Sequence, residues 1–108
     1  MKDGSAYVRI RFIEAMLQTY GRVNRKVICD VFGVAEPTAT RDLASYRELN
    51  RTIIFDGPNK QWIAGDNFKP SPDVLHMPAL ELIELLQKLY GVKIQMVVTK
   101  VRLGAEKP

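Results

Sequence analysis

Cysteine and histidine are nearly missing from this sequence of 108 residues, which contains one of each. A single cysteine excludes an intramolecular disulfide and favours a reducing, cytoplasmic setting. We interpret Cys29 as a small buried hydrophobic residue, with a reactive thiol as the alternative. His76 has no partner in a metal-binding or acid–base motif, so we expect no metal and no other cofactor.

Long apolar runs and enzyme signatures are missing as well. No segment approaches the roughly 20 apolar residues that a membrane span needs, and no signal peptide precedes Tyr7. Nor does the sequence contain a glycine-rich phosphate loop, a paired acidic motif or a nucleophile elbow. We therefore expect neither a membrane partner nor an enzyme.

The composition is that of a folded protein with a mild basic surplus. Hydrophobic residues make up 46% of the chain and charged residues 26%, which argues against disorder. The 16 Lys and Arg outnumber the 12 Asp and Glu, which gives a net charge of +4 and a pI near 9.4. A nucleic acid or another anionic partner is therefore plausible.

The first segment predicts an amphipathic helix. Apolar residues recur at intervals of three and four from Tyr7 to Tyr20, and Gly21 ends the pattern. Arg9 and Arg11 do not both lie on the apolar face, so at least one of them should be solvated.

A second helix follows after a short extended segment. Residues 22–23 suit a one-rung strand, and Asn24 is a good N-cap for the helix that follows. Gly33 ends this helix because glycine readily takes the left-handed conformation of a helix C-terminus. Val34 would then fill the corner before the next helix.

A third helix is predicted from about Glu36 to Leu49, with Pro37 in its first turn. One narrow sector of this helix should face inward: Ala39, Leu43, Tyr46 and Asn50. The opposite face has short polar side chains, one long cation and no large apolar group: Pro37, Thr40, Arg41, Ala44, Ser45 and Glu48. Such a face could approach a DNA groove closely.

A β-hairpin and a linker complete the first part of the chain. Residues rich in β-formers at 52–55 and 61–64 lie on either side of the turn-type sequence DGPNK. Segment 65–72 contains Gly, Asp, Asn and two prolines, which is typical of a linker. We therefore predict an α+β fold, with a winged helix-turn-helix domain at 1–70 and a separate C-terminal element at 71–108.

The order of these elements predicts binding to double-stranded DNA. In a helix-turn-helix, the second helix of the pair enters the major groove, which is roughly 12 Å wide. We expect base contacts from four residues of the third helix: Pro37, Thr40, Arg41 and Ser45. Arg41 is the first choice, because a guanidinium can bond both acceptors of guanine. The alternative is a solvated arginine paired with Asp42 or Glu48.

Phosphate contacts are expected around the groove-facing helix. The candidates are Asn24, Arg25, Lys26, Thr38, Arg47 and Lys60. The first three lie at the start of the second helix, where backbone N–H groups and the helix dipole favour an anion. A merely solvated basic turn is the alternative for them, and a solvated lysine is the alternative for Lys60.

The sequence resembles the N-terminal winged helix-turn-helix of DeoR-like bacterial and phage regulators, most closely the WYL-domain repressors that guard phage-defence loci. The resemblance covers about 9–70 and is most specific at FGVAEPTATRDLASY and at the FKP that closes the wing. It implies a dimeric transcriptional repressor whose groove-facing helix carries Thr38, Thr40, Arg41 and Ser45. The sequence departs from the family in two places. Ala35 replaces the usual capping Ser or Thr, and the ligand-sensing WYL domain is missing, so the resemblance gives no argument for a nucleic-acid effector. No small-molecule effector is evident either.

The C-terminal third predicts a helix followed by a strand. Leucines and isoleucine recur at helical spacing between Pro78 and Gly91, and the β-branched run 92–103 reads as a strand. We expect two copies to pair these strands and to pack the helix on the resulting sheet. The dimerisation residues would be Leu82, Leu86, Leu89, Ile94, Met96, Val97, Val98 and Val101. The alternative is that helix and strand fold back on their own winged domain.

Together these observations predict a homodimeric repressor that reads an inverted-repeat operator in the cytoplasm of a bacterial cell or a phage-infected host. The alternative is a winged-helix module for protein–protein interaction, such as an adaptor or antirepressor. Binding to random DNA across a salt series would distinguish them, because only the first requires salt-sensitive DNA binding.

Overall fold

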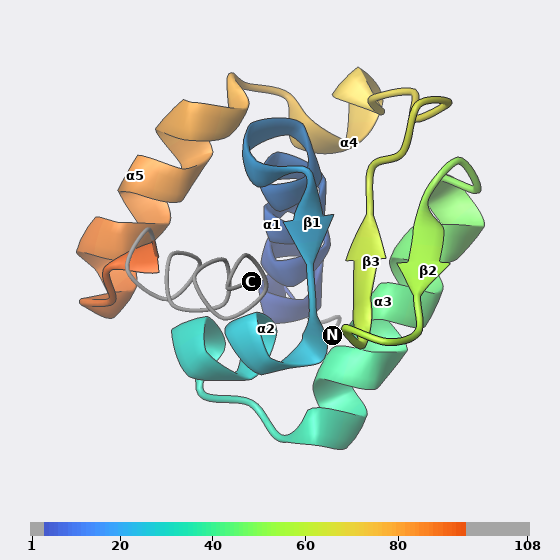
Figure 1. Ribbon diagram of the computed structural model, residues 1–108. Coiled ribbons are helices and arrows are strands. Elements are labelled where there is room, and N and C mark those ends of the chain that lie inside the picture. The colour runs from blue at the N-terminus through green and yellow to red at the C-terminus, as the bar shows by residue number, and fades with distance from the viewer. Residues whose placement is uncertain (1–3, 95–108) are drawn as a thin grey trace, which may run out of the picture.

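The computed structural model describes residues 4–94 and contains five helices and three short strands in that range (Figure 1). In chain order these are α1 (Gly4–Tyr20), β1 (Arg22–Val23), α2 (Arg25–Phe32), α3 (Glu36–Leu49), β2 (Ile54–Asp56), β3 (Gln61–Ile63), α4 (Pro72–Leu75) and α5 (Ala79–Tyr90). The three helices, the one-rung strand and the hairpin expected before residue 65 are all present. The α+β class and the winged helix-turn-helix are thus confirmed.

Local signals fix the ends of α2 and α3. The Asn24 side chain accepts a hydrogen bond of 2.8 Å from the Val27 N–H, and Gly33 follows α2 with a left-handed φ of 69°. Pro37 lies in the first turn of α3, where its missing N–H costs nothing. Ala35 precedes α3 and provides no side-chain cap, as the sequence indicated.

The three strands form one antiparallel sheet in the order β1-β3-β2. Phe55 is opposite Trp62 in the wing, and Val23 pairs with the other edge of β3. The expected first strand began at residue 52, but β2 begins at Ile54. The reason is that the side chain of Asn50 accepts hydrogen bonds from the N–H and hydroxyl of Thr52 and holds this residue in a turn.

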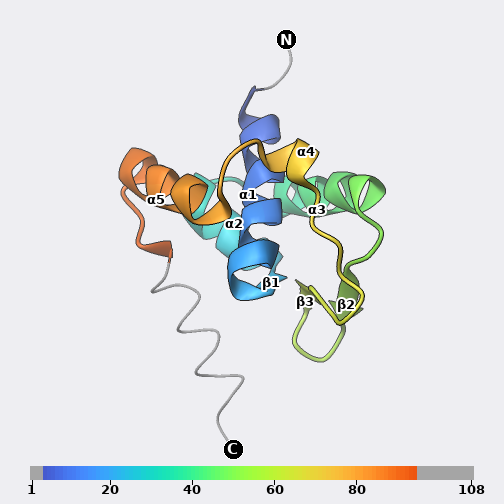
Figure 2. The same ribbon diagram turned by 90° about the horizontal axis from the view of Figure 1, so that it is seen from above.

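Helix α1 runs through the centre of the molecule, with α3 on one side and α5 on the other (Figure 2). Phe12, Ile13, Met16 and Leu17 of α1 are almost fully buried in one continuous core. Phe32 of α2 makes edge-on contacts with Phe12 and with Tyr90 of α5, at ring-centroid distances of 5.3 and 5.0 Å. Helix α5 therefore folds back on the winged domain, which was the alternative arrangement.

Segment 65–71 does not behave as a free linker. The Ser71 N–H donates to Glu14 of α1 at 2.8 Å, and the Asn50 amide donates to the Lys69 carbonyl at 2.8 Å. Helix α4 follows directly, and its Leu75 carbonyl accepts a bond of 2.8 Å from Arg11. The boundary expected at residue 70 therefore lies inside one packed unit.

Neither arginine of α1 extends into solvent, contrary to the expectation for at least one of them. Arg9 is 6% exposed and forms an ion pair with Asp42 of α3, and Arg11 is half-buried against the carbonyl of Leu75. Both guanidiniums find acceptors that come from distant segments. Both arginines are thus paired with groups that are far away in the sequence but near in space, although the helical pattern did not place both of them on the apolar face.

The strand expected at 92–103 is not found in its described part. Val92 and Lys93 belong to no strand, and Ile94 is helical and fully buried. Residues 95–103 lie outside the described residues, as do 104–108. No helix among residues 4–94 has both the length and the apolar character needed to cross a membrane.

Candidate nucleic-acid interface

Helix α3 presents the two faces that its sequence predicted. Ala39, Leu43, Tyr46 and Asn50 are buried. All four residues expected to contact bases are exposed: Pro37, Thr40, Arg41 and Ser45. No large apolar side chain interrupts the surface between them, so a DNA groove could approach the helix backbone.

Arg41 forms an ion pair with neither Asp42 nor Glu48, the two partners that its sequence suggested. Asp42 is paired with Arg9, and Glu48 accepts a bond of 2.6 Å from Arg51. No ion pair within residues 4–94 includes Arg41. Its guanidinium therefore remains available for a partner outside the chain.

The Arg9–Asp42 pair holds α3 against α1. The Arg9 Nε lies 2.5 Å from Asp42 Oδ2, and both side chains are less than 8% exposed. Successive helical residues are about 100° apart, so when Asp42 and Leu43 both face inward, Arg41 lies on the outer side of α3. Sequence reasoning missed this pair, and its only signal was an acidic residue beside the buried position Leu43.

A buried polar network holds the C-terminal half of α3. The Tyr46 hydroxyl donates to the fully buried carboxylate of Glu14, and Asn50 donates to Ser71 Oγ at 3.0 Å. Burial raises the pKa of Tyr46, and the neighbouring Glu14 raises that pKa further. The network was also missed, although an acidic Glu14 inside the apolar run from Phe12 to Leu17 was a visible signal.

The residues at the start of α2 have distinct roles. The Asn24 side chain is engaged as the N-cap, and Lys26 pairs with Asp30 at 3.2 Å on the exposed surface. Arg25 reaches across to α3, where it donates to Thr40 Oγ1 at 3.3 Å and lies 3.8 Å from Glu36. Of the three, Arg25 thus has the direct connection to α3.

The three remaining phosphate candidates lie in different surroundings. The Arg47 guanidinium stacks over the Trp62 ring, 5.3 Å from its centroid, so it is directed toward the wing. Thr38 is half-buried in the first turn of α3, where its N–H donates to the Ala35 carbonyl. Lys60 is exposed at the wing turn with a left-handed φ of 52°.

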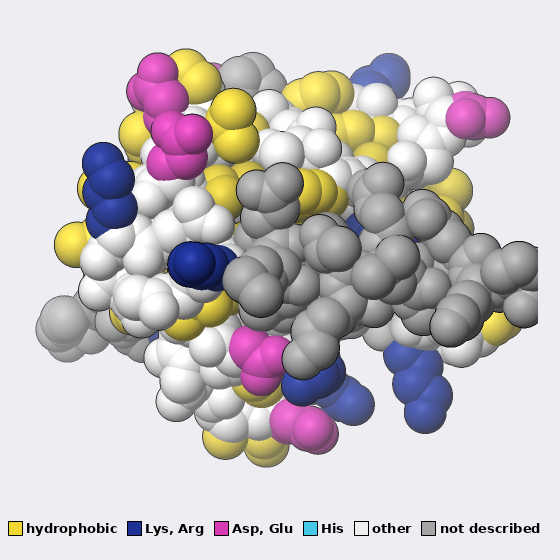
Figure 3. Space-filling model, turned by 60° about the vertical axis from the view of Figure 1, so that its left-hand side comes forward, with side chains coloured by type: hydrophobic (Ala, Val, Ile, Leu, Met, Phe, Trp, Pro, Cys, Tyr) yellow, Lys and Arg dark blue, Asp and Glu magenta, His cyan; other side chains and the backbone are white. Residues whose placement is uncertain are grey.

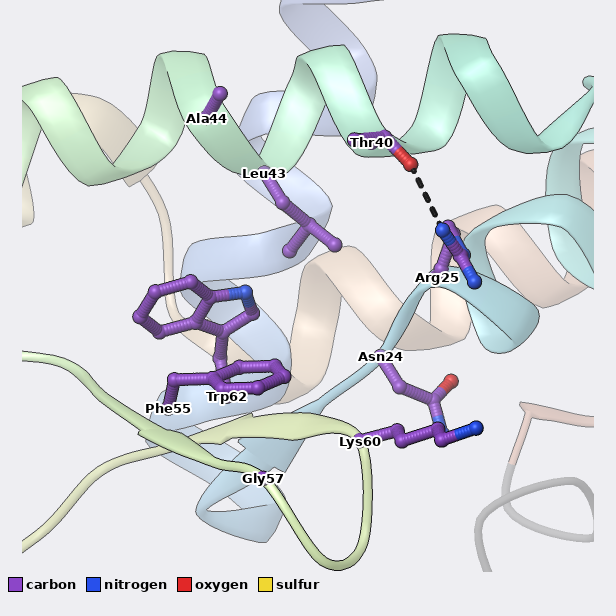
Figure 4. A pocket seen from close by; sticks show the side chains of 9 residues that line it. All are labelled: Asn24, Arg25, Thr40, Leu43, Ala44, Phe55, Gly57, Lys60 and Trp62. Atoms are coloured by element: carbon purple, nitrogen blue, oxygen red, sulfur yellow. Dashed lines mark hydrogen bonds between the residues drawn. The ribbon is translucent and has the colours of Figure 1, made fainter.

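An open cleft lies between α3 and the wing (Figure 4). It brings together four predicted residues from three segments: Asn24, Arg25, Thr40 and Lys60. The rings of Phe55 and Trp62 line its other end, where Trp62 is a half-buried wall of the cleft that also packs against the core. Arg41 and Ser45 do not line it.

Cys29 is half-buried, and burial raises the pKa of its thiol, with a further contribution from Glu36. A raised pKa lowers the thiolate fraction at neutral pH, which suits the interpretation as a packing residue. Residues 4–94 contain no group of three His, Cys, Asp or Glu that could hold a metal ion.

The residues expected to contact a second copy fall into three groups: buried residues, one exposed residue, and residues outside the described range. Leu82 and Leu86 pack into the chain's own core because the apolar stripe of α5 faces α1, and Ile94, which follows α5, is buried in the same core. Leu89 is 68% exposed, and Met96, Val97, Val98 and Val101 lie outside the described residues. Three further exposed apolar residues of α5 were not predicted: Leu80, Leu85 and Tyr90. Hydrophobic and charged side chains are interspersed on this side of the molecule (Figure 3).

The fold and this interface define a winged helix-turn-helix domain of the kind that transcriptional regulators use to bind DNA. The family model of the BrxR transcriptional regulator winged helix-turn-helix domain matches residues 5–88, and the chain belongs to this family. It is also 33% identical over 63 residues to the DNA-binding transcriptional repressor CapW of Stenotrophomonas maltophilia. That match covers 57% of the chain and 21% of CapW, so the matched part of the chain corresponds to about a fifth of this relative.

Proposed function

We propose that this chain is a homodimeric repressor that recognises an inverted-repeat operator in double-stranded DNA. The observation that carries the proposal is the exposed Arg41, which forms no ion pair with residues 4–94, on a helix that buried polar contacts hold on its opposite face. A rigid helix with an available guanidinium suits direct readout, because bidentate contact to guanine requires a fixed approach. The family and the similarity to a repressor support the same function.

In this proposal the groove-facing residues divide by role. Arg41 bonds a guanine, Thr40 and Ser45 contact neighbouring base edges, and Pro37 brings the start of α3 close to the groove. Phosphates are bound by Arg25, Lys26, Thr38, Arg47 and Lys60. Asn24 acts indirectly, because its side chain caps α2 and so orients the backbone N–H groups at that helix start.

The dimer is proposed to form through the outer face of α5. Leu85 and Leu89 are 44% and 68% exposed, respectively, whereas the inner face of α5 is already used in the core. A twofold dimer would place two α3 helices about 34 Å apart, which is one turn of DNA and matches an inverted repeat. The proposal also locates the protein in the cytoplasm of a bacterial cell or a phage-infected host. It includes no small-molecule effector.

Selection of bound sites from a random duplex library tests the function. We expect an inverted repeat to be enriched and to bind at least a thousand-fold more tightly than random DNA, which is typical of specific regulators. A gel shift across a salt series should show binding that weakens steeply with salt. If the pure protein shows no salt-sensitive DNA binding, the protein-interaction alternative replaces this proposal.

A further inference from the structure

The cleft between α3 and the wing has a charged end and an aromatic end. Arg41, the proposed base contact, does not line it. Its cations, Arg25 and Lys60, lie at one end, and the rings of Phe55 and Trp62 lie at the other (Figure 4). The cleft has a volume of about 530 Å³. Sites for small ligands have volumes of roughly 300–1,000 Å³, so the cleft has room for a group much larger than water.

Among residues 4–94, Phe55 is the open part of the apolar end of the cleft, whereas Arg47 stacks over Trp62. Phe55 is 52% exposed and makes a tilted contact with Trp62 at 5.0 Å between ring centroids. Helix α3 contributes the small, exposed residue Ala44 to the lining of the cleft. An exposed aromatic surface in a hollow favours a partner with an apolar face.

The charged end is built from two segments. Arg25 is directed into the cleft by its bond to Thr40, while Lys60 approaches from the wing turn. The left-handed φ of 52° at Lys60 is uncommon for a residue with a side chain, and glycine or asparagine would adopt it at lower cost. Strained backbone of this kind is often found at binding sites, where the side chain is needed.

We propose that this cleft seats one nucleotide of a DNA strand, with its phosphate bound by both Arg25 and Lys60 and its deoxyribose packed against Phe55. This inference rests on the proposed function and names the strand contact at that site. In a nucleotide, the phosphate anion is attached directly to the deoxyribose ring, which has an apolar face. The phosphate therefore matches the charged end of the cleft, and the sugar matches the aromatic end. Because phosphate contacts set position without reading sequence, this nucleotide would fix the depth of α3 in the groove.

The shared phosphate is tested by replacing single phosphates of the selected operator with neutral methylphosphonates, one at a time. In the wild type, one replacement per half-site should weaken binding about ten-fold, as expected when a charge-assisted contact is lost. Arg25→Gln and Lys60→Gly should each become less sensitive to that same phosphate, because each variant keeps one of the two cations. If the two variants become less sensitive to different phosphates, or neither variant does, the shared seat is wrong.

The sugar contact is tested by Phe55→Ala, with Ile54→Ala as the matched control. Ile54 is 49% exposed on the same strand, but its side chain points to the other face and does not line the cleft. Phe55→Ala should weaken specific and random DNA alike, by about five-fold, without changing the salt slope. Lys60→Gly should instead lower that slope by about 0.9. If Phe55→Ala binds as tightly as Ile54→Ala, the sugar contact is wrong.

Fluorescence of Trp62, the single tryptophan, distinguishes a DNA strand from a free nucleotide as the occupant. Operator DNA should change the emission, whereas thymidine monophosphate at millimolar concentration should not. A saturable change with the free nucleotide would overturn the assignment to a DNA strand. If the wild type binds no duplex at all, the proposed function fails too. Failure of the methylphosphonate or Phe55 test, with specific binding intact, removes only this inference.

Discussion

Arg9 and Asp42 are 33 residues apart in the sequence and form a buried ion pair between α1 and α3. Asp42 is the immediate neighbour of Arg41, so one residue holds the helix and the next is left exposed for a partner. The pair thereby links the stability of the core to the orientation of the α3 face that carries Arg41.

Removing one member of this pair should destabilise the fold strongly. Asp42→Ala leaves the Arg9 guanidinium buried without a counter-ion, which typically costs about 3–5 kcal/mol. Urea unfolding followed by circular dichroism measures this loss. Asp30→Ala is the control, because its pair with Lys26 is exposed and should contribute less than about 1 kcal/mol. Similar losses in the two variants would show that the buried pair does not stabilise the fold.

The buried Tyr46 predicts a loss of stability in alkaline solution. Burial and Glu14 raise the pKa of Tyr46 above its ordinary value of about 10, so above that pH the unfolded chain releases a proton that the folded chain retains. The contribution of Tyr46 is therefore complete below about pH 10 and declines by about 1.4 kcal/mol per pH unit above it. Tyr46→Phe should lack this component in unfolding measurements from pH 8 to 11. Parallel pH profiles for the two proteins would contradict the prediction.

Arg41→Ala should cost about 1–3 kcal/mol of binding free energy on the preferred operator and relax base preference at one position of each half-site. The reason is the loss of a bidentate contact to guanine. Titration of operators carrying each base at every position measures both effects. Arg51→Ala removes an exposed cation at the far end of the helix and serves as the control. Unchanged affinity and preference in Arg41→Ala would exclude Arg41 from the groove.

Lys26→Ala should weaken binding to all sequences equally. Lys26 is exposed at the start of α2, where a phosphate contact carries no sequence information. The slope of log affinity against log salt should become shallower by about 0.9, since one counterion fewer is released. Gel shifts at several salt concentrations with operator and random duplexes provide the measurement. A loss confined to the operator would point to a base contact instead.

Leu89→Gln should weaken the dimer without unfolding the chain, because Leu89 is 68% exposed on α5. Light scattering over a micromolar concentration series should give a dimer for the wild type and a larger monomer fraction for the variant. Leu49→Gln is the matched control, since Leu49 is 60% exposed at the end of α3. A wild type that stays monomeric at high micromolar concentration would remove the two-half-site geometry.

Local signals in the sequence made α3 and the turn before it predictable. Pro37, the spacing of Ala39, Leu43 and Tyr46, and the glycine at position 33 act within one or two helical turns, so the bounds of α3 and its faces follow from the sequence. The position of α5 in the fold could not be derived from the sequence. An amphipathic stripe of leucines has the same sequence pattern whether it packs on a second copy or on α1 of its own chain.

The sequence by itself thus determined the helices, the wing and which side of α3 carries Arg41, because periodicity and capping depend on near neighbours. Only the tertiary structure decided which charges are satisfied. Asp42 and Glu14 find their partners across the fold, and the cleft exists because α2, α3 and the wing meet there. These are contacts between distant segments, and their geometry depends on how the whole chain packs.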